Sequence, residues 1–251
     1  MTTAMRTAAT SPAPDGWTRK HAFAGGVLYL ITFVSSIPAL LLIAPVLDDA
    51  GYIVGAGSDT RVLWGSFLNL VNALACVGTA VAVFPVVKRK NEALALGFVT
   101  SRLVEAAVIL IGVVSLLSVV TLRQNFAGTG GDAATLVTTG QALVTLHDWT
   151  FLLGPGFMAC INALLFGTLL YRARLVPRII PVIGLIGAPL LLTANIATFF
   201  GHNDQLSAWT LLATLPIAAW ELSVGTYMLV KGFRTTAITA RTPEVPASVN
   251  V

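Results

Sequence analysis

The chain has 251 residues, of which 56% are hydrophobic and only 10% are charged, and its formal net charge is +4. Soluble domains contain about 25% charged residues, and a mean hydropathy of +0.84 leaves too few polar side chains to cover a surface that faces water. This composition argues against a soluble enzyme, a disordered protein, a disulfide scaffold and a nucleic-acid-binding protein, and it predicts an integral membrane protein.

Six apolar runs follow one another along the chain, and each is long enough to form a membrane-spanning helix. We expect helices at about residues 22–47, 62–87, 97–122, 149–171, 179–201 and 206–230. None of the runs alternates apolar and polar residues with a period of two, as the strands of a transmembrane β-barrel do. The sequence therefore predicts an all-α bundle of six transmembrane helices.

The segments outside these runs are polar or rich in turn-forming residues. Residues 1–21 and 235–251 are predicted to be disordered cytoplasmic tails, and residues 22–234 to form the transmembrane domain. The longest connection precedes the fourth run, and its glycines at 128–131 predict a turn. Asp132 is the expected N-cap of a short interfacial helix that leads into the fourth run. No Lys-Ser/Thr pair follows the glycines, which argues against a phosphate-binding loop.

Basic residues collect in alternate connections, and this pattern predicts the orientation of the chain. Twelve of the 15 Lys and Arg residues lie before the first run, after the sixth run, or in the second and fourth connections. The other connections contain only Arg61 and Arg123, together with six Asp residues. Because cytoplasmic loops are enriched in Lys and Arg, we expect both termini in the cytoplasm.

Proline occurs in five of the six runs, and the Gly154-Pro155-Gly156 sequence predicts the strongest interruption. Two interpretations remain open: a bend that improves helix packing, and a broken helix that lines a site, as in transporters. The two cysteines, Cys76 and Cys160, lie deep within apolar runs. They are predicted to be small buried side chains rather than a disulfide.

Three ionisable residues lie inside the apolar runs, where a charge costs about 2.5–3.5 kcal/mol on insertion scales. Arg102 and Glu105 are three residues apart, which places them on one face of the third helix. Glu221 has no charged residue within one helical turn, so its partner must come from another helix. At a rise of about 1.5 Å per residue, the three groups lie at similar depths. We therefore expect Arg102 to bridge Glu105 and Glu221 in the inner half of the bundle.

Amide side chains on other helices are expected to extend this cluster. They are Asn69, Asn72, Asn162 and Asn195. One arginine for two carboxylates leaves a deficit of one positive charge, which a proton, a cation or a substrate amine would supply. The alternative is a structural ion pair that holds the third and sixth helices together.

A second polar group is predicted at the outer boundary of the membrane. His147 and Asp148 precede the fourth run, while His202 and Asp204 follow the fifth. Together they would be able to bind Zn²⁺ or to supply the acid and base of an intramembrane hydrolase. Asp148 is equally explained as a favourable charge near a helix start. We assign no metal or cofactor, and no known catalytic motif supports an enzyme.

Several segments, in the same order along the chain, resemble a bacterial membrane family known as domain of unknown function 4386. They are residues 101–106, 146–149, 151–156, 171–172, 175–178, 220–223 and 231–233. The resemblance covers about residues 23–234 and implies a multi-helix protein of the bacterial inner membrane, without an assigned activity. It also implies that the Arg-x-x-Glu pair, the His-Asp pair and the glutamate of the sixth helix belong to the family pattern.

We expect a multi-pass bacterial plasma-membrane protein that handles a small molecule, an ion or a lipid through Arg102, Glu105 and Glu221. Both glutamates would lie on the third helix of their half of the chain, an arrangement that suits an inverted-repeat transporter. An intramembrane hydrolase that uses the outer His and Asp residues is one alternative. A non-catalytic sensor or partner subunit is another, and no nucleic-acid partner is expected.

Overall fold

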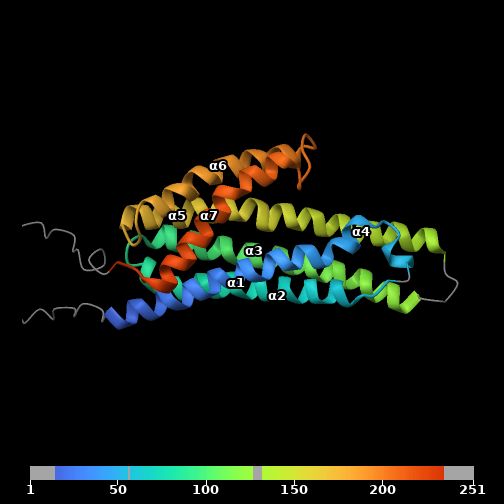
Figure 1. Ribbon diagram of the computed structural model, residues 1–251, viewed down its shortest axis with the longest axis horizontal. Helices are drawn as coiled ribbons and strands as arrows, with labels where there is room; N and C mark the ends of the chain where they lie inside the picture. The colour runs from blue at the N-terminus through green and yellow to red at the C-terminus, as the bar shows by residue number, and fades with distance from the viewer. Residues whose placement is uncertain (1–14, 56, 127–131, 235–251) are drawn as a thin grey trace, which may run out of the picture.

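The computed structural model describes residues 15–55, 57–126 and 132–234 (Figure 1). Within these ranges the chain is helical and contains no strand. The helices are α1 (Asp15–Asp48), α2 (Thr60–Val87), α3 (Glu92–Phe126), α4 (Ala133–Phe151), α5 (Ala159–Ala173), α6 (Ile179–Phe199) and α7 (Ala208–Val230). Two short elements join them: the 3-10 turn η1 (Tyr52–Val54) and the π-helical segment η2 (Leu152–Met158).

The described residues include six helical runs that are long and apolar enough to cross a membrane. Five are single helices, and the sixth is the continuous run Ala133–Ala173, which consists of α4, η2 and α5. The predicted all-α fold with six membrane-spanning helices is therefore confirmed. The start of α1 and the end of α7 lie at the same end of the elongated bundle (Figure 1).

Several helices extend beyond the apolar runs that predicted them. Residues 15–21 form the first turns of α1, so the expectation that the whole segment 1–21 is disordered is wrong for these residues. The other residues of that tail, the second tail and residues 127–131 lie outside the described residues. The fourth spanning helix begins at Ala133 rather than near residue 149. Asp132 does cap it, because its side chain accepts a hydrogen bond of 3.1 Å from the backbone N–H of Ala134.

The early start of α4 has a physical cause that hydropathy does not detect. Its exposed residues between 133 and 145 are small or polar, whereas Leu136, Val137, Leu143 and Val144 pack inward against a second apolar core. From Leu146 onward the exposed residues of this run include large apolar side chains, such as Trp149. The exposed face of the first turns of α4 is therefore suited to contact with water, and the membrane-facing surface of this helix begins near Leu146.

Helices α1 to α4 project beyond the turn between α6 and α7 (Figure 1). At their far end, Arg123 of α3 forms an ion pair of 2.6 Å with Asp59, which precedes α2. Tyr52 of η1 donates a hydrogen bond of 3.0 Å to the same carboxylate. Burial, reinforced by this bond to Asp59, raises the pKa of Tyr52. These contacts fix the connection between α1 and α2 against α3.

The principal core lies toward the end of the bundle where α1 begins and α7 ends. Aromatic side chains from four helices meet there: Tyr29 of α1, Phe98 of α3, Phe166 of α5 and Trp220 of α7. Helix α7 packs on α1 and α6, whereas α3 packs on α2, α4 and α5. This arrangement determines which polar side chains are able to reach one another.

Candidate functional site

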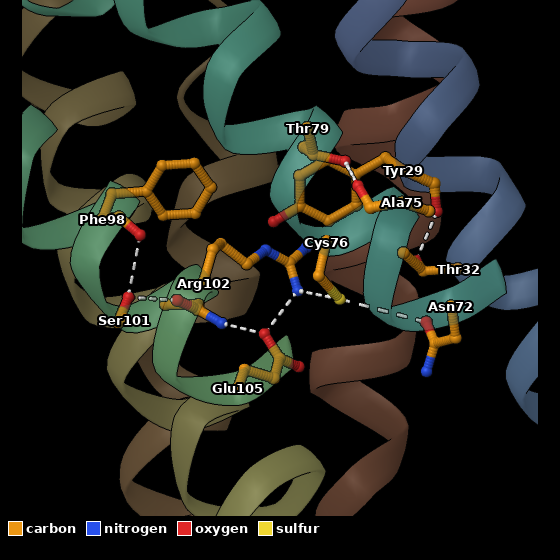
Figure 2. Close-up of polar contacts among 11 residues, drawn as sticks. Tyr29, Thr32, Asn72, Ala75, Cys76, Thr79, Phe98, Ser101, Arg102 and Glu105 are labelled. Carbon is orange, nitrogen blue, oxygen red and sulfur yellow. Dashed lines mark hydrogen bonds and ion pairs between the residues drawn. The ribbon is translucent and has the colours of Figure 1, made fainter. Parts of the chain in front are cut away.

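A buried ion pair forms the centre of the candidate site (Figure 2). Arg102 and Glu105, both on α3, are only 2% and 6% exposed, and Arg102 Nη1 lies 2.8 Å from Glu105 Oε2. Asn162 of α5 donates from Nδ2 to the same oxygen at 2.7 Å. Ser101 in turn donates to the Asn162 side-chain oxygen. The pair is thus held by two helices, as expected for a charge in an apolar interior.

Helices α1 and α2 complete the surroundings of Arg102. Its Nη1 also donates to Cys76 Sγ at 3.6 Å, and the Tyr29 ring lies 4.8 Å from the guanidinium carbon. Figure 2 shows the Tyr29 ring beside the guanidinium group, with Cys76 at its tip. The cation therefore lies against an aromatic ring and is paired with one carboxylate.

One edge of Arg102 makes no hydrogen bond in the described part of the chain. Both Nε and Nη2 are enclosed and have no partner, and the same holds for the Tyr29 hydroxyl. A buried donor without an acceptor costs about 1–3 kcal/mol. Two N–H groups on one guanidinium edge match the two oxygens of a carboxylate or another oxyanion. The site therefore has unused capacity for an acceptor of this shape.

Glu221 lies near this centre but does not contact it directly. Its side chain is half-buried, and its charge interacts with those of Arg102 and Glu105 across the helix interface. Among the described residues, however, Glu221 forms no hydrogen bond or ion pair, so the expected bridge from Arg102 to both carboxylates is not formed. The cause is topological, because α7 packs on α1 and α6 rather than on α3.

The four amides predicted to extend the cluster are placed differently. Asn162 contacts Glu105 directly, and Asn72 is linked to Arg102 through the Cys76 thiol, which lies 4.0 Å from Asn72 Oδ1. Asn195 instead contacts the other thiol, with its Nδ2 3.9 Å from Cys160 Sγ. Asn69 lines a cavity farther along α2. Only two of the four amides thus belong to the Arg102 network.

That cavity has a volume of about 70 Å³ and lies between α1, α2, α3 and α4. Its polar lining consists of Ser36, Asn69, Asn72, His147 and Thr150. Pro155 of the π-helical segment η2 also lines it. The Gly154-Pro155-Gly156 interruption therefore lies beside a cavity as a π-helical turn, a feature frequent at functional sites.

The outer His and Asp residues do not form one cluster. His147 is buried, and its Nδ1 lies 3.5 Å from the neighbouring Asp148 carboxylate. Gln205 donates to the backbone oxygen of Asp148 at 2.9 Å, which places the turn between α6 and α7 against α4. His202 and Asp204 on that turn are exposed. No group of three His, Cys, Asp or Glu residues suited to a metal ion occurs in the described ranges.

Sequence reasoning missed three residues of the site. Tyr29 and Ser101 contact the Arg102 network, and Cys76 accepts a hydrogen bond where an inert apolar side chain was expected. A tyrosine inside an apolar run was a usable signal, because a buried phenol needs a polar neighbour. For the serine and the cysteine, only knowledge of helix packing would have revealed the contact.

Comparison with known proteins gives one match. The family model described as "Domain of unknown function (DUF4386)" matches residues 24–232. No curated protein and no solved structure matches the chain. The matched range includes Arg102, Glu105, Glu221 and His147, so the buried pair and the cavity both lie within the family's common region.

Proposed function

We propose that this chain, which belongs to the DUF4386 family, is a carrier-type protein of the bacterial plasma membrane that binds a small solute with a carboxylate or similar oxyanion at Arg102. In this proposal both termini are cytoplasmic, and the solute site lies in the inner half of the bundle. The family assignment and the six apolar helices establish a multi-pass membrane protein of an uncharacterised family. The solute is inferred from the chemistry of the site.

The free edge of Arg102 is the observation that supports this proposal. A purely structural ion pair is stable only when its hydrogen-bonding groups are satisfied. Here Arg102 is 2% exposed, yet Nε and Nη2 have no partner among the described residues. A planar oxyanion would accept from both groups and would remove the cost of leaving them unpaired.

The charges of the site favour a solute that enters together with a proton. Arg102 already neutralises Glu105, and the nearby Glu221 has no cation of its own in the described part of the chain. A bound anion would add a second uncompensated negative charge to an apolar interior, which is costly. Protonation of Glu221 would remove one of these charges, so Glu221 is the proposed proton-carrying group.

The two alternative functions have less support. An outer-face hydrolase needs an acid and a base that converge on a substrate, but His202 and Asp204 are exposed and make no described contact with His147. A sensor or partner subunit does not require a buried arginine edge without a partner.

Binding of simple anions tests the proposal. Purified protein would be tested with acetate, lactate and benzoate, and with acetamide as the uncharged analogue of acetate. We expect at least one anion to raise the unfolding temperature, because a ligand that binds only the folded state stabilises it. Acetamide should have no effect, and radiolabelled anion should enter proteoliposomes.

Two variants locate the site. Arg102→Lys keeps the charge but lacks the paired N–H edge, so it should remain folded and lose most of the anion effect. The Glu221→Gln variant should still bind the anion, but its binding should no longer depend on pH. The proposal is wrong if none of the three anions stabilises the wild type, or if the lysine variant responds as strongly as the wild type.

A further inference from the structure

We propose that the cavity lined by His147 is a hydrated entrance, through which water and small neutral polar molecules reach Arg102 from the end of the bundle opposite the termini. This inference rests on the proposed solute site, because it assigns the route by which water and neutral molecules reach that site. The residues that line the cavity do not include Arg102, so the entrance is tested separately from the solute site.

Five residues in the largely apolar lining of the cavity are polar, and most of their hydrogen-bonding groups have no partner in the described ranges. His147 is buried, and in the described ranges its Nε2 makes no hydrogen bond. Asn72 uses only its oxygen, toward Cys76, and Asn69 and Ser36 make no described side-chain hydrogen bond. Polar groups in such a cavity require partners, and about 70 Å³ is room for a few water molecules. We infer that water supplies these partners.

The cavity ends one helical turn from the ion pair. Asn72 lies in its wall, and Cys76, four residues further along α2, accepts from Arg102 Nη1. On α3, Ile109 also lines the cavity, and Glu105 of the ion pair lies four residues before it. The Asn72–Cys76 contact therefore links the wall of the cavity to Arg102 through the Cys76 thiol.

The other end of the cavity approaches the outer boundary of the membrane. His147 lies next to Leu146, where the exposed surface of α4 changes from polar to large apolar residues. Gly112 lines this end, where α3 packs closely on α4: an added Cβ would lie 2.5 Å from Thr150 Oγ1 and 3.3 Å from the His147 ring. Among the described residues, no Lys, Arg, Asp or Glu lines the cavity, so its chemistry suits water and neutral solutes.

The two native cysteines provide a test that does not require the solute. Cys76 and Cys160 are 1% and 0% exposed; in the described ranges Cys76 hydrogen-bonds to Asn72 of the cavity wall, whereas the hydrogen bonds of Cys160 go to Gly156 and Asn195. Infrared spectroscopy follows the S–H to S–D exchange of a thiol after transfer into D₂O. Cys160→Ala leaves only Cys76, and Cys76→Ala leaves only Cys160. We expect Cys76 to exchange about tenfold faster or more, because a dry buried thiol exchanges only through local opening.

Filling the cavity should abolish this difference. Asn69→Leu and Gly112→Ala should each slow the exchange of Cys76 to the rate of Cys160. Gly78→Ala is the matched control, since the three atoms nearest to its Cβ would all belong to the Leu28 side chain, which does not line the cavity. If Gly112→Ala does not fold, Asn69→Leu provides the same test. The inference is overturned if Cys76 exchanges as slowly as Cys160, or if filling the cavity leaves its exchange unchanged. Anion binding at Arg102 can still succeed in either case.

Discussion

At the residue scale, the polar centre of the protein depends on a single oxygen atom, Glu105 Oε2. It accepts from Arg102 Nη1 at 2.8 Å and from Asn162 Nδ2 at 2.7 Å. Because both donors are buried, loss of this acceptor charge would leave an unpaired guanidinium in an apolar interior. Glu105 therefore has a structural role beside any part in solute binding.

Glu105→Gln should destabilise the protein by about 3 kcal/mol, because breaking one side of a buried ion pair leaves the other charge uncompensated. The measurement is the unfolding free energy in detergent. Arg102→Met combined with Glu105→Leu removes both charges and should recover most of the loss. Equal destabilisation of the single and double variants would show that the pair contributes through packing rather than charge.

The spacing of charges along one helix was sufficient to predict part of this centre. Residues three apart share a helix face, and Arg102 and Glu105 form an ion pair. Similar depth was not sufficient for Glu221, because depth says nothing about which helices are neighbours. In the fold, α7 lies against α1 and α6, and Tyr29 of α1 occupies the face of the guanidinium group.

At the element scale, the start of α4 depends on a capping side chain that titrates. Asp132 accepts from the Thr135 hydroxyl at 2.5 Å and from the Ala134 N–H, and these hydrogen bonds lower its pKa from 3.8. A lowered folded-state pKa adds stability that is present above 3.8 and is lost as the pH falls through the lowered value. The cap therefore weakens only in acid.

Hydrogen-exchange protection of the first turn of α4 should consequently be retained above pH 3.8 and should decrease as the pH falls below that value. Asp132→Asn retains an N-cap acceptor but has no titrating group, so its protection should be independent of pH in this range. Protection factors by mass spectrometry, corrected for the intrinsic pH dependence of exchange, give the comparison. A similar loss in the asparagine variant would assign the effect to another group.

The packing of α1 on α7 depends on a residue without a side chain. A Cβ at Gly26 would lie 2.5 Å from the backbone nitrogen of Leu229 and 2.8 Å from the Gly225 oxygen. Backbone atoms cannot move aside as a side-chain tip can, so this contact requires glycine. Small residues commonly permit such close approach between membrane helices.

Gly26→Ala should therefore destabilise the protein by about 1–3 kcal/mol, the usual range for overpacking. Gly78→Ala is the comparison, because the three atoms nearest to its Cβ would be side-chain atoms of Leu28, the closest at 3.1 Å. Thermal unfolding in the same detergent measures both variants. Equal stability of the two proteins would mean that α1 shifts away from α7 without cost.

The existence of the six helices was predictable from the sequence, whereas some of their ends were not. Apolar runs identify membrane-spanning helices because a helix needs about 20 mostly apolar residues to cross the bilayer interior. Helix ends in water follow other causes, such as the Asp132 cap and the inward packing of Leu136 and Leu143. The first turns of α1, from Asp15, are a second case in which a helix continues beyond its apolar run.

At the scale of the whole molecule, the bundle has two chemically different ends. The end that contains both described chain ends includes most of the Lys and Arg residues between the helices. The opposite end consists of the projecting parts of α1 to α4, with Asp59 and the exposed polar surface of α4. The proposed entrance opens toward this second end, while the Arg102 site lies nearer the first.

Cysteine labelling in intact bacterial cells determines which end faces the cytoplasm. In a background with Cys76→Ala and Cys160→Ala, Thr138→Cys reports on the exposed start of α4 and Glu92→Cys on the exposed start of α3. Because basic connections remain inside, a membrane-impermeant maleimide should label Thr138→Cys in intact cells and Glu92→Cys only after permeabilisation. Leu164→Cys, exposed on the apolar surface of α5, should resist labelling in both conditions. The reverse pattern would place the termini outside, and the His147 cavity would then open toward the cytoplasm.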